Sequence, residues 1–315
     1  MLDLHCGTRL LRGGCVIVGL VFCLSGGVTG EVGSFSSCPQ FFYNGQPPTQ
    51  LGGRGYPQIC QRYHNTYHLA SLYHRQWRTP LYSAYRFTAG GGRRPKTPWK
   101  YEPQLANSRA NPEMRSFPKN GSVDQNVWES QAVLGDYRGS NYTKGHLSPS
   151  SHHRDPRDQR ATFSLTNIVP QRAGSNSGPW AVLEREVADR LAANCTGPAY
   201  LVTGVLPYIA NQHHIANRVA VPEYLWSAYC CPSFSPGLPP EVRPFFPTHA
   251  AIGRNDRESD QDIVPVDPKA HPSVRGYDVR RMTLGTLEMY LQERLGEAIN
   301  VFNNRCQQQH ESSAE

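Results

Sequence analysis

The sequence predicts an α+β fold with a mixed or antiparallel central sheet and flanking helices. Short runs of apolar or alternating residues, typical of strands, recur along most of the chain. Two longer stretches carry apolar residues at helical spacing, one near the middle of the chain and one near its C-terminus. The 28 glycines and 26 prolines are scattered and no internal repeat is present, which is typical of one loop-rich domain.

Residues 1–30 are predicted to be a secretory signal peptide. Arg9 and Arg12 make its beginning positive, and Cys15 to Ser25 forms an apolar run. This run is shorter than the ~20 residues of a membrane span, although an uncleaved anchor is the alternative reading. Val28 and Gly30 are small enough for cleavage near Gly30. No later segment reaches spanning length, so we expect a secreted, extracellular protein without stable membrane insertion.

Residues 31–306 are predicted to form the single domain of the mature chain, and residues 307–315 a polar C-terminal tail. The whole sequence has 32 basic and 25 acidic residues, which give a formal net charge of +7. A moderate positive charge favours polyanions such as DNA or RNA as partners. The charge therefore permits a nucleic-acid substrate without requiring one.

Secretion would place the cysteines in an oxidising compartment. The cysteines outside the predicted signal peptide are Cys38, Cys60, Cys195, Cys230, Cys231 and Cys306. An even number in a secreted chain indicates disulfides, although the sequence leaves their pairing open. Because Cys230 and Cys231 are adjacent, we expect them to bond to two different partners. Glycosylation sequons that begin at Asn120, Asn141 and Asn194 agree with export.

Residue patterns in the N-terminal half of the sequence predict a packed helix face, a strand and a loop. Tyr63, Tyr67 and Tyr73 stand beside histidines at helical spacing, which predicts the packed face. Arg78 to Phe87 alternates like a strand. The glycine-rich and basic stretch from Gly90 to Pro98 follows as a loop. Whether this loop is only solvated or also contacts nucleic acid stays open.

The central segment predicts a strand, a turn, a second strand and a helix. The first strand carries His146. Thr162 to Asn167 is rich in strand-forming residues and would pair back against it, and Pro170 would end this second strand. The helix then begins with Ser177 as its cap and Pro179 in its first turn. Its apolar face is formed by Trp180, Leu183, Val187 and Leu191.

The C-terminal half predicts two more strands and a second helix. Ala199 to Val205 is a short apolar run typical of a buried strand. Val219 to Tyr229 predicts another strand, broken or begun at Pro222. From Thr283 to Asn303 the apolar residues recur at helical spacing, which predicts an amphipathic helix whose end Cys306 could tether.

Three polar residues of the central segment suit one metal ion held against a phosphate. A neutral His146 can take a proton from water, and Gly145 before it would let a substrate backbone approach closely. Asn176, just before the helix, offers an oxygen to a hard cation. Glu184 lies eight residues later, ~12 Å along a helix, so it would act through metal-bound water. Mg²⁺ suits so few protein ligands, with Mn²⁺ as the alternative.

Asn176 and Glu184 also have an ordinary structural interpretation. Asn176 could be only a helix cap, and Glu184 only an exposed helix residue. His152 and His153 lie close by in the sequence, and we expect them in a solvated loop rather than in a site. The order of His146, Asn176 and Glu184 along one strand–strand–helix unit favours the site.

The segment resembles the active site of the DNA/RNA non-specific endonuclease family, which is built on a ββα-metal (His-Me finger) motif. Within that family the chain resembles the vertebrate endonuclease domain-containing 1 proteins. The resemblance covers most of the mature chain and includes Tyr82–Tyr85, Asp136–Tyr137, Thr203–Val205, Pro222 and Trp226. It implies that His146 is the general base, Asn176 binds the metal, Glu184 holds metal-bound water, and Asn167 is a further active-site residue.

The chain departs from the family pattern just before the histidine. Members usually read Asp-Arg-Gly-His, whereas this chain has Thr143 and Lys144 before Gly145. Lys144 keeps a positive charge that could steady a phosphate oxygen, but it lacks the bidentate grip of arginine. A family arginine is also replaced by Thr97. Three nearby basic residues could compensate for it: Arg93, Arg94 and Lys96.

The resemblance implies a secreted, magnesium-dependent endonuclease that hydrolyses DNA with little sequence specificity, with RNA left open as a second substrate. The departures at Thr143, Lys144 and Thr97 motivate an alternative. In that alternative the chain is a catalytically weakened nuclease-fold protein that binds nucleic acid or other polyanions.

Overall fold

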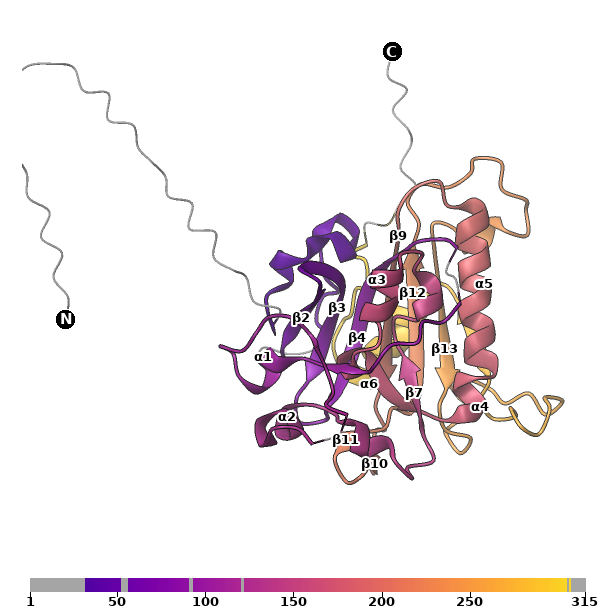
Figure 1. Cartoon of the computed structure of the whole chain (residues 1–315). Coiled ribbons are helices and arrows are strands. Elements are labelled where there is room, and N and C mark those ends of the chain that lie inside the picture. Colours follow the sequence, from indigo (N-terminus) through magenta and orange to yellow (C-terminus); the bar gives the residue numbers. More distant parts are fainter. Residues whose placement is uncertain (1–31, 52–55, 91–92, 120–121, 305, 307–315) are drawn as a thin grey trace, which may run out of the picture.

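The computed structural model describes residues 32–51, 56–90, 93–119, 122–304 and 306. Its main sheet has eight strands in the order β1-β2-β3-β4-β9-β12-β13-β14, and all neighbours are antiparallel (Figure 1). The strands are β1 (Val32–Gly33), β2 (Gln58–Tyr63), β3 (Thr66–His74), β4 (Thr79–Phe87), β9 (Ala199–Leu206), β12 (Tyr224–Cys230), β13 (Thr248–Arg254) and β14 (Val279–Met282). The predicted α+β fold on an antiparallel sheet is confirmed, whereas the predicted signal peptide, the C-terminal tail and Asn120 lie outside the described residues.

Two long helices cover opposite faces of the sheet. Helix α5 (Pro179–Asn194) packs on the face that includes Leu201 and Val205 of β9. Helix α6 (Leu284–Leu295) packs on the face that includes Val202 and Leu206. Since neighbouring residues of a strand point to opposite faces, β9 is buried on both sides. Figure 1 shows the same order of layers, with α5 in front of the sheet and α6 behind it.

The amphipathic pattern of α5 is the one the sequence predicts. Its buried residues are Trp180, Leu183, Val187 and Leu191. The helix begins with Pro179 at its first position, but its N-cap is Gly178, which provides no side-chain cap, so the predicted Ser177 cap is wrong. At Gly253 in β13 a side chain would meet the Trp180 ring at 2.7 Å. The glycine therefore allows the helix to approach the sheet closely.

The central segment forms a two-stranded antiparallel sheet followed by a helix. Strand β7 (Thr143–His146) pairs with β8 (Ile168–Gln171), and His146 lies opposite Ile168. The short helix α4 (Ala173–Asn176) follows β8 and leads into α5. This is the predicted strand–strand–helix order, displaced by a few residues.

The second strand of this unit begins later than predicted. Leu165–Asn167 is a 3₁₀ turn, and Pro170 lies inside β8 instead of ending it. A two-stranded sheet has only edge strands, so the missing N–H of a proline need not break it. The strand-forming residues from Thr162 onward are buried because they pack into the core, not because they pair with β7.

The fold also contains short α-helices and strand pairs. They are α1 (Pro103–Ala106), α2 (Gln125–Ser130), α3 (Pro156–Ala161) and the strand pairs β5 (Lys100–Tyr101) with β6 (Arg115–Ser116) and β10 (His214–Ile215) with β11 (Val219–Ala220). A separate hydrophobic cluster, which includes Val133, Ile168 and Val219, joins β8 to β11 and to the segment after α2. Through Ile168 of β8, this cluster packs against the β7–β8 pair and supports it.

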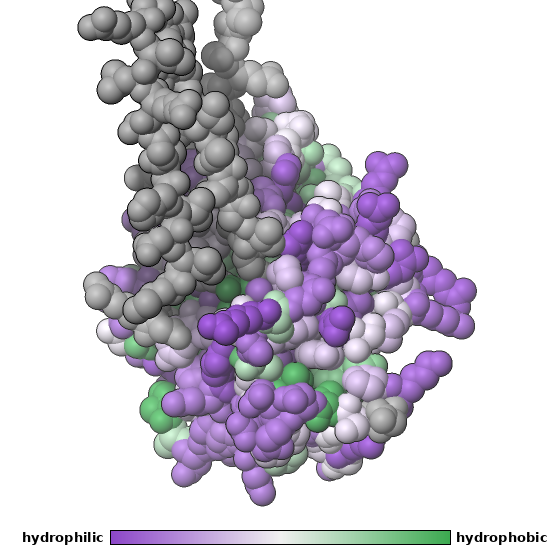
Figure 2. Space-filling model, turned by 60° about the vertical axis from the view of Figure 1, so that its left-hand side comes forward, coloured by the Kyte–Doolittle hydropathy of each residue, from purple (hydrophilic) through white to green (hydrophobic). Residues whose placement is uncertain are grey.

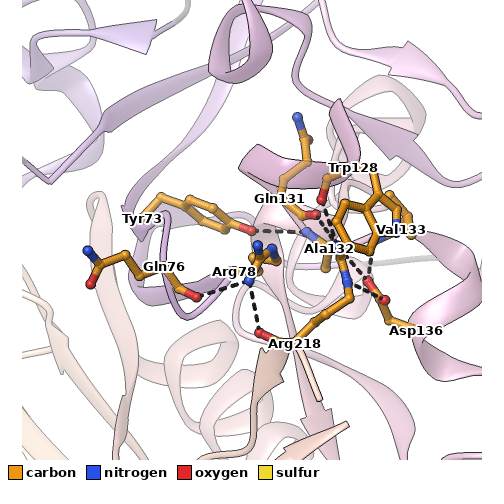
Figure 3. A network of polar contacts seen from close by, with 9 residues as sticks. All are labelled: Tyr73, Gln76, Arg78, Trp128, Gln131, Ala132, Val133, Asp136 and Arg218. Atoms are coloured by element: carbon orange, nitrogen blue, oxygen red, sulfur yellow. Dashed lines mark hydrogen bonds and ion pairs between the residues drawn. The ribbon is translucent and has the colours of Figure 1, made fainter. Parts of the chain in front are cut away.

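A buried ion pair fixes the same region (Figure 3). Arg218, next to β11, donates to Asp136 at 2.9 Å and to the carbonyl oxygens of Trp128 and Gln131. The Asp136 carboxylate also accepts from the Val133 N–H at 2.8 Å. The Arg218 guanidinium lies 3.6 Å from the centroid of the Trp128 ring. These contacts attach the β10–β11 hairpin to the chain that leads into β7.

The predicted helix face at Tyr63, Tyr67 and Tyr73 is wrong. These residues belong to β2 and β3, which are joined by a two-residue turn at His64 and Asn65, both with positive φ. Such a turn is the usual connection of a tight hairpin. Most of β3 is buried on both faces, so the sequence shows no alternation that would reveal a strand.

The other predicted elements hold with shifted ends. The strand predicted at Arg78–Phe87 is β4, and that at Ala199–Val205 is β9. The run predicted from Val219 is broken around Pro222 into β11 and β12. Helix α6 ends at Leu295 because Gly296 takes a left-handed conformation, φ +76°. The residues after it stay buried without being helical.

All six predicted disulfide cysteines are paired. The bonds are Cys38–Cys60, Cys195–Cys231 and Cys230–Cys306. The expectation that Cys230 and Cys231 bond to two different partners is confirmed. Cys306 reaches the sheet at β12, so the chain after α6 is tied back to the fold.

The outer surface is polar where it can be seen. Figure 2 shows a face that is mostly hydrophilic, with hydrophobic residues in small separate patches. Within the described ranges, no helix combines the length and the apolar character that crossing a bilayer requires.

Candidate active site

His146 is held at the end of β7 in an aromatic enclosure. Its ring lies 5.0 Å from that of Phe163 in an edge contact and 5.6 Å from that of Trp99. Only 8% of the residue is exposed. Burial, helped by the charge of Arg94, lowers the pKa of His146 to about 3. The imidazole is therefore neutral at physiological pH, as a general base must be.

One ring nitrogen of His146 is without a partner. Nε2 is buried and has no hydrogen bond to any atom of the described residues. A buried polar atom without a partner costs free energy, and such atoms in native proteins usually have a function or an ordered water. The unpaired nitrogen is therefore free of hydrogen bonds from the described part of the protein and available to accept a proton.

Gly145 makes room for a protein side chain, not for a substrate. A side chain at this position would meet Gln171, whose Cβ would lie 2.7 Å away. Gln171 crosses over Gly145 from the paired strand and donates to Ser175 Oγ at 2.9 Å. The interpretation that Gly145 leaves space for a substrate backbone is therefore corrected. The glycine lets β7 and β8 lie close together.

Asn167 holds the backbone that follows His146. Its Oδ1 accepts from the Ser148 N–H at 3.0 Å, and its Nδ2 donates to the carbonyl oxygens of Ser148 and Thr162. Its own carbonyl accepts from the Leu147 N–H at 3.0 Å. The residue is fully buried. The structure thus gives Asn167 a positioning role, with both amide hydrogens used by the protein.

His152 and His153 support the same turn. They are 2% exposed each, so their expected place in a solvated loop is wrong. His152 contacts the Tyr85 hydroxyl at 3.0 Å and the carbonyl of Glu184 at 2.9 Å. His153 contacts the Ser148 hydroxyl at 2.8 Å. These hydrogen bonds tie the turn after β7 to helix α5.

Asn176 is oriented by Thr143. The Thr143 hydroxyl donates to the Gln171 carbonyl at 2.7 Å, so its oxygen can only accept from the Asn176 Nδ2 at 2.9 Å. The amide orientation of Asn176 is thereby settled. Its Oδ1 has no hydrogen-bond partner among the described residues and is free to bind a cation. Thr143, which lacks the family carboxylate, still orders the site through its hydroxyl.

Glu184 lies in the first half of α5, where it lines a small cavity together with Leu147 and His152 from the turn after β7. Burial raises the pKa of its carboxyl to about 8, although the nearby Trp180 indole and the charges of Arg185 and Arg94 oppose this. A carboxyl with this environment lacks enough positive charge around it to stay ionised. A divalent cation would supply that charge.

Two basic side chains flank His146. The Lys144 ammonium lies 4.9 Å from the Tyr137 ring centroid and 5.6 Å from that of Trp99, the ring that also contacts His146. Burial lowers its pKa. Because residues two apart on a strand share a face, Lys144 and His146 point to the same side of β7.

Arg94 is a site residue that the sequence names only as one of three candidates. Its guanidinium lies 5.0 Å from the Phe163 centroid, and Phe163 packs against His146. Its charge lowers the pKa of both His146 and Glu184, so it acts on both sides of the site. Thr97, which replaces the family arginine, instead accepts from the buried Lys100 at 3.3 Å.

The donors present fit a magnesium-like ion. The free Asn176 Oδ1 and the Glu184 carboxyl are hard oxygen donors, as Mg²⁺ requires. Within the described part of the chain, no group of three or more His, Cys, Asp or Glu residues could hold a metal on its own. An ion at this site would therefore keep several waters, which is the usual state of protein-bound Mg²⁺.

Comparisons with known proteins identify the family of this chain. The family model described as DNA/RNA non-specific endonuclease matches residues 48–272. The endonuclease domain-containing 1 protein of Homo sapiens is 34% identical over 225 residues, 68% of this chain and 43% of that protein. Endonuclease G, mitochondrial, of Bos taurus is 33% identical over 105 residues, 30% of this chain and 35% of that protein.

The chain is also similar to solved structures. A chain in the crystal structure of the EndoG/EndoGI complex has a TM-score of 0.49 and 20% sequence identity, and the match covers 77% of this chain and 85% of that chain. The chain spans less than half the length of the curated relatives it matches. The family model covers most of the sequence and includes every candidate site residue, from Arg94 to Glu184. The chain belongs to the DNA/RNA non-specific endonuclease family.

Proposed function

We propose that this protein is a secreted, divalent-metal-dependent endonuclease that hydrolyses phosphodiester bonds of DNA, and of RNA, with little sequence specificity. The observation that carries the proposal is the buried, neutral His146 with an unpaired Nε2, set in the β7–β8 pair that α4 and α5 follow. Family membership supports nuclease chemistry. The metal, the range of substrates and the place of action are our inference.

Each residue has a distinct part in the proposed reaction. His146 Nε2 takes a proton from the water whose oxygen bonds to phosphorus. The bond from phosphorus to the leaving oxygen breaks, and that oxygen takes a proton from solvent water and departs as an alcohol. Lys144 and Arg94 place positive charge against the phosphate oxygens. Asn167 keeps the backbone after His146 in place. Asn176 and Glu184 would hold Mg²⁺ or Mn²⁺, which when bound supplies positive charge to the phosphate.

The test is cleavage of supercoiled plasmid by the purified protein with and without Mg²⁺. His146→Ala should lower the rate by ~10²–10⁴-fold, the usual contribution of a general base, and leave the melting temperature nearly unchanged. His271→Ala, a change at an exposed histidine, is the control and should cleave normally. Equal cleavage by His146→Ala, or full cleavage in a chelator, would refute the proposal.

The same assay separates the alternative of a weakened nuclease that only binds nucleic acid. That alternative predicts salt-dependent binding of DNA without nicking at any divalent-metal concentration. Lys144 lies between aromatic rings and remains the position most affected by the departure from the family. Restoring arginine there, Lys144→Arg, should raise the cleavage rate if weak phosphate contact limits the reaction.

Secretion rests on the apolar run after Arg12 in the sequence and on the three disulfides, which form and persist in oxidising compartments. Expression of the full chain in cultured secretory cells should release the protein into the medium with an N-terminus near residue 31. Retention of the protein in the cytosol with free thiols would overturn this part of the proposal.

A further inference from the structure

We propose that Asn141 carries an N-linked glycan that stands at one end of the active-site strand and limits access of polymeric substrates. The sequon is Asn141-Tyr142-Thr143, and its last residue is the first residue of β7. The limit on access rests on the proposed endonuclease function, whereas the modification itself does not.

The fold presents Asn141 at the tip of a turn. The residue is exposed and has a left-handed backbone, φ +60°, which asparagine tolerates better than most residues. Ser140 fixes the turn, since its hydroxyl donates to the Tyr137 carbonyl and accepts from the Tyr142 N–H. The Asn141 carboxamide makes no hydrogen bond with the described residues. Its nitrogen is therefore open to modification.

The second sequon with a described asparagine is less favourable. Asn194 is half-buried at the last residue of α5, and its Nδ2 donates to the Arg190 carbonyl at 2.9 Å. The next residue, Cys195, is bonded to Cys231. Asn194 is thus a matched comparison for Asn141, because it has the sequon and lacks the free, exposed carboxamide.

The modification requires an oligosaccharide carried on a lipid pyrophosphate, the usual donor in the secretory pathway. The Asn141 Nδ2 forms a bond to C1 of the first sugar and loses one proton. The bond from C1 to the pyrophosphate oxygen breaks, and the lipid pyrophosphate leaves. No change of oxidation state is involved.

The position of the glycan gives it a consequence for the site. Asn141 lies five residues before His146 and two before the start of β7, so Asn141 and His146 are at most ~17 Å apart at 3.3 Å per residue of extended chain. An N-linked glycan is bulky and lies on the surface, and Tyr142 beside it packs under the Arg172 guanidinium, 4.1 Å from its ring centroid. A duplex that extends along β7 from His146 would meet the glycan, whereas a small diester would not.

Thr143 couples the modification to the metal site. Its hydroxyl completes the sequon and also orients Asn176. Loss of the hydroxyl would therefore remove the glycan and disturb the site together. Asn141→Gln removes the glycan and keeps Thr143, because the exposed Asn141 carboxamide makes no hydrogen bond with the described residues, and this is the variant to use.

The experiment uses the full mature chain, expressed behind a cleavable heterologous signal in glycosylating cells. Release of glycans by peptide N-glycosidase in ¹⁸O water converts an occupied asparagine to labelled aspartate, which peptide mass spectrometry locates. We expect the label at Asn141 in most molecules, and a faster-migrating band for Asn141→Gln. Asn194→Gln, the matched variant, should leave the Asn141 label in place. An unlabelled Asn141 in protein recovered from the medium overturns the proposal.

The second measurement tests the effect on the site. Asn141→Gln should cleave plasmid several-fold faster than the glycosylated protein and cleave a small chromogenic phosphodiester at the same rate. Equal plasmid rates for the two proteins overturn the limit on access. If neither protein cleaves either substrate, the proposed endonuclease function fails, while the mass measurement still decides the modification.

Discussion

The close approach of β7 and β8 at Gly145 allows a sharp test of how the site is built. Gly145→Ala would place a Cβ 2.7 Å from the Gln171 Cβ and 3.1 Å from its Cδ. Carbon atoms in contact prefer about 3.5–4.0 Å. Because the Gln171 Cβ is attached to the backbone and cannot rotate away, the strands must separate by about 1 Å.

That separation should affect both stability and rate. Overpacking of this kind costs about 1–3 kcal/mol, which lowers the melting temperature by about 2–4 °C per kcal/mol in a protein of this size. His146 is the next residue and would move with the strand. A misplacement near 1 Å can lower an enzymatic rate by about 10²-fold. Thermal unfolding and plasmid nicking measure the two effects on the same sample.

Two further variants make the reasoning refutable. Gly285→Ala is the control, since a Cβ there meets nothing within 4 Å, and it should be at least as stable as the parent. In a Gln171→Gly background the obstructing Cβ is absent, so Gly145→Ala should cost much less. If Gly145→Ala has the same cost in both backgrounds, or no cost in either, the close approach does not explain the glycine.

Three other outcomes are expected. Arg94→Ala should lower kcat/KM for plasmid by about 10- to 100-fold, because a charge-assisted hydrogen bond contributes about 1.5–3 kcal/mol. The control is Arg93→Ala, a change at the exposed neighbouring residue, which should alter kcat/KM little. Equal losses in the two variants would show that only the charge of the loop matters. Arg254→Met should lower the free energy of unfolding in urea by at least about 3 kcal/mol. The reason is that the buried guanidinium donates to five carbonyl oxygens between Arg257 and Gly276. A loss under about 1 kcal/mol would contradict this. Burial lowers the pKa of His152 and His153 to about 4, so below pH ~6.5 the unfolded chain binds more protons than the folded one. Stability should therefore fall as the pH is lowered from about 6.5 to about 4, by on the order of 3 kcal/mol for each histidine. His152→Gln should make the melting temperature depend less on pH, and an unchanged pH dependence would exclude this origin.

Much of the central segment could be predicted because its signals are local. Trp180, Leu183, Val187 and Leu191 repeat at helical spacing, and the structure buries all four. The turn between β2 and β3 could not be predicted in the same way, because His64 and Asn65 are not the glycine-containing pair that usually marks such a turn. Burial of β3 on both faces removed the alternation that would have identified it.

The candidate site shows the same division. The order of His146, Asn176 and Glu184 along the chain identified the unit, but the contacts around them involve residues far away in the sequence. Asn176 is oriented by Thr143, and His146 packs against Trp99. Asn167 could be named only from the family resemblance, and its role in holding the Ser148 backbone needed the structure. Arg94 reaches the site from a loop about fifty residues earlier, and nothing in that loop's sequence distinguishes it from Arg93.

The adjacent cysteines at the end of β12 bind the two layers of the protein at one point. Cys230 faces the α6 side of the sheet and bonds to Cys306, while Cys231 faces the α5 side and bonds to Cys195. Loss of a native disulfide typically costs 2–5 kcal/mol. In a reducing compartment both helical layers would thus lose an anchor on the same strand end. The helix that carries Glu184 would then loosen together with the opposite face, which makes the whole nuclease unit sensitive to the redox state of its surroundings.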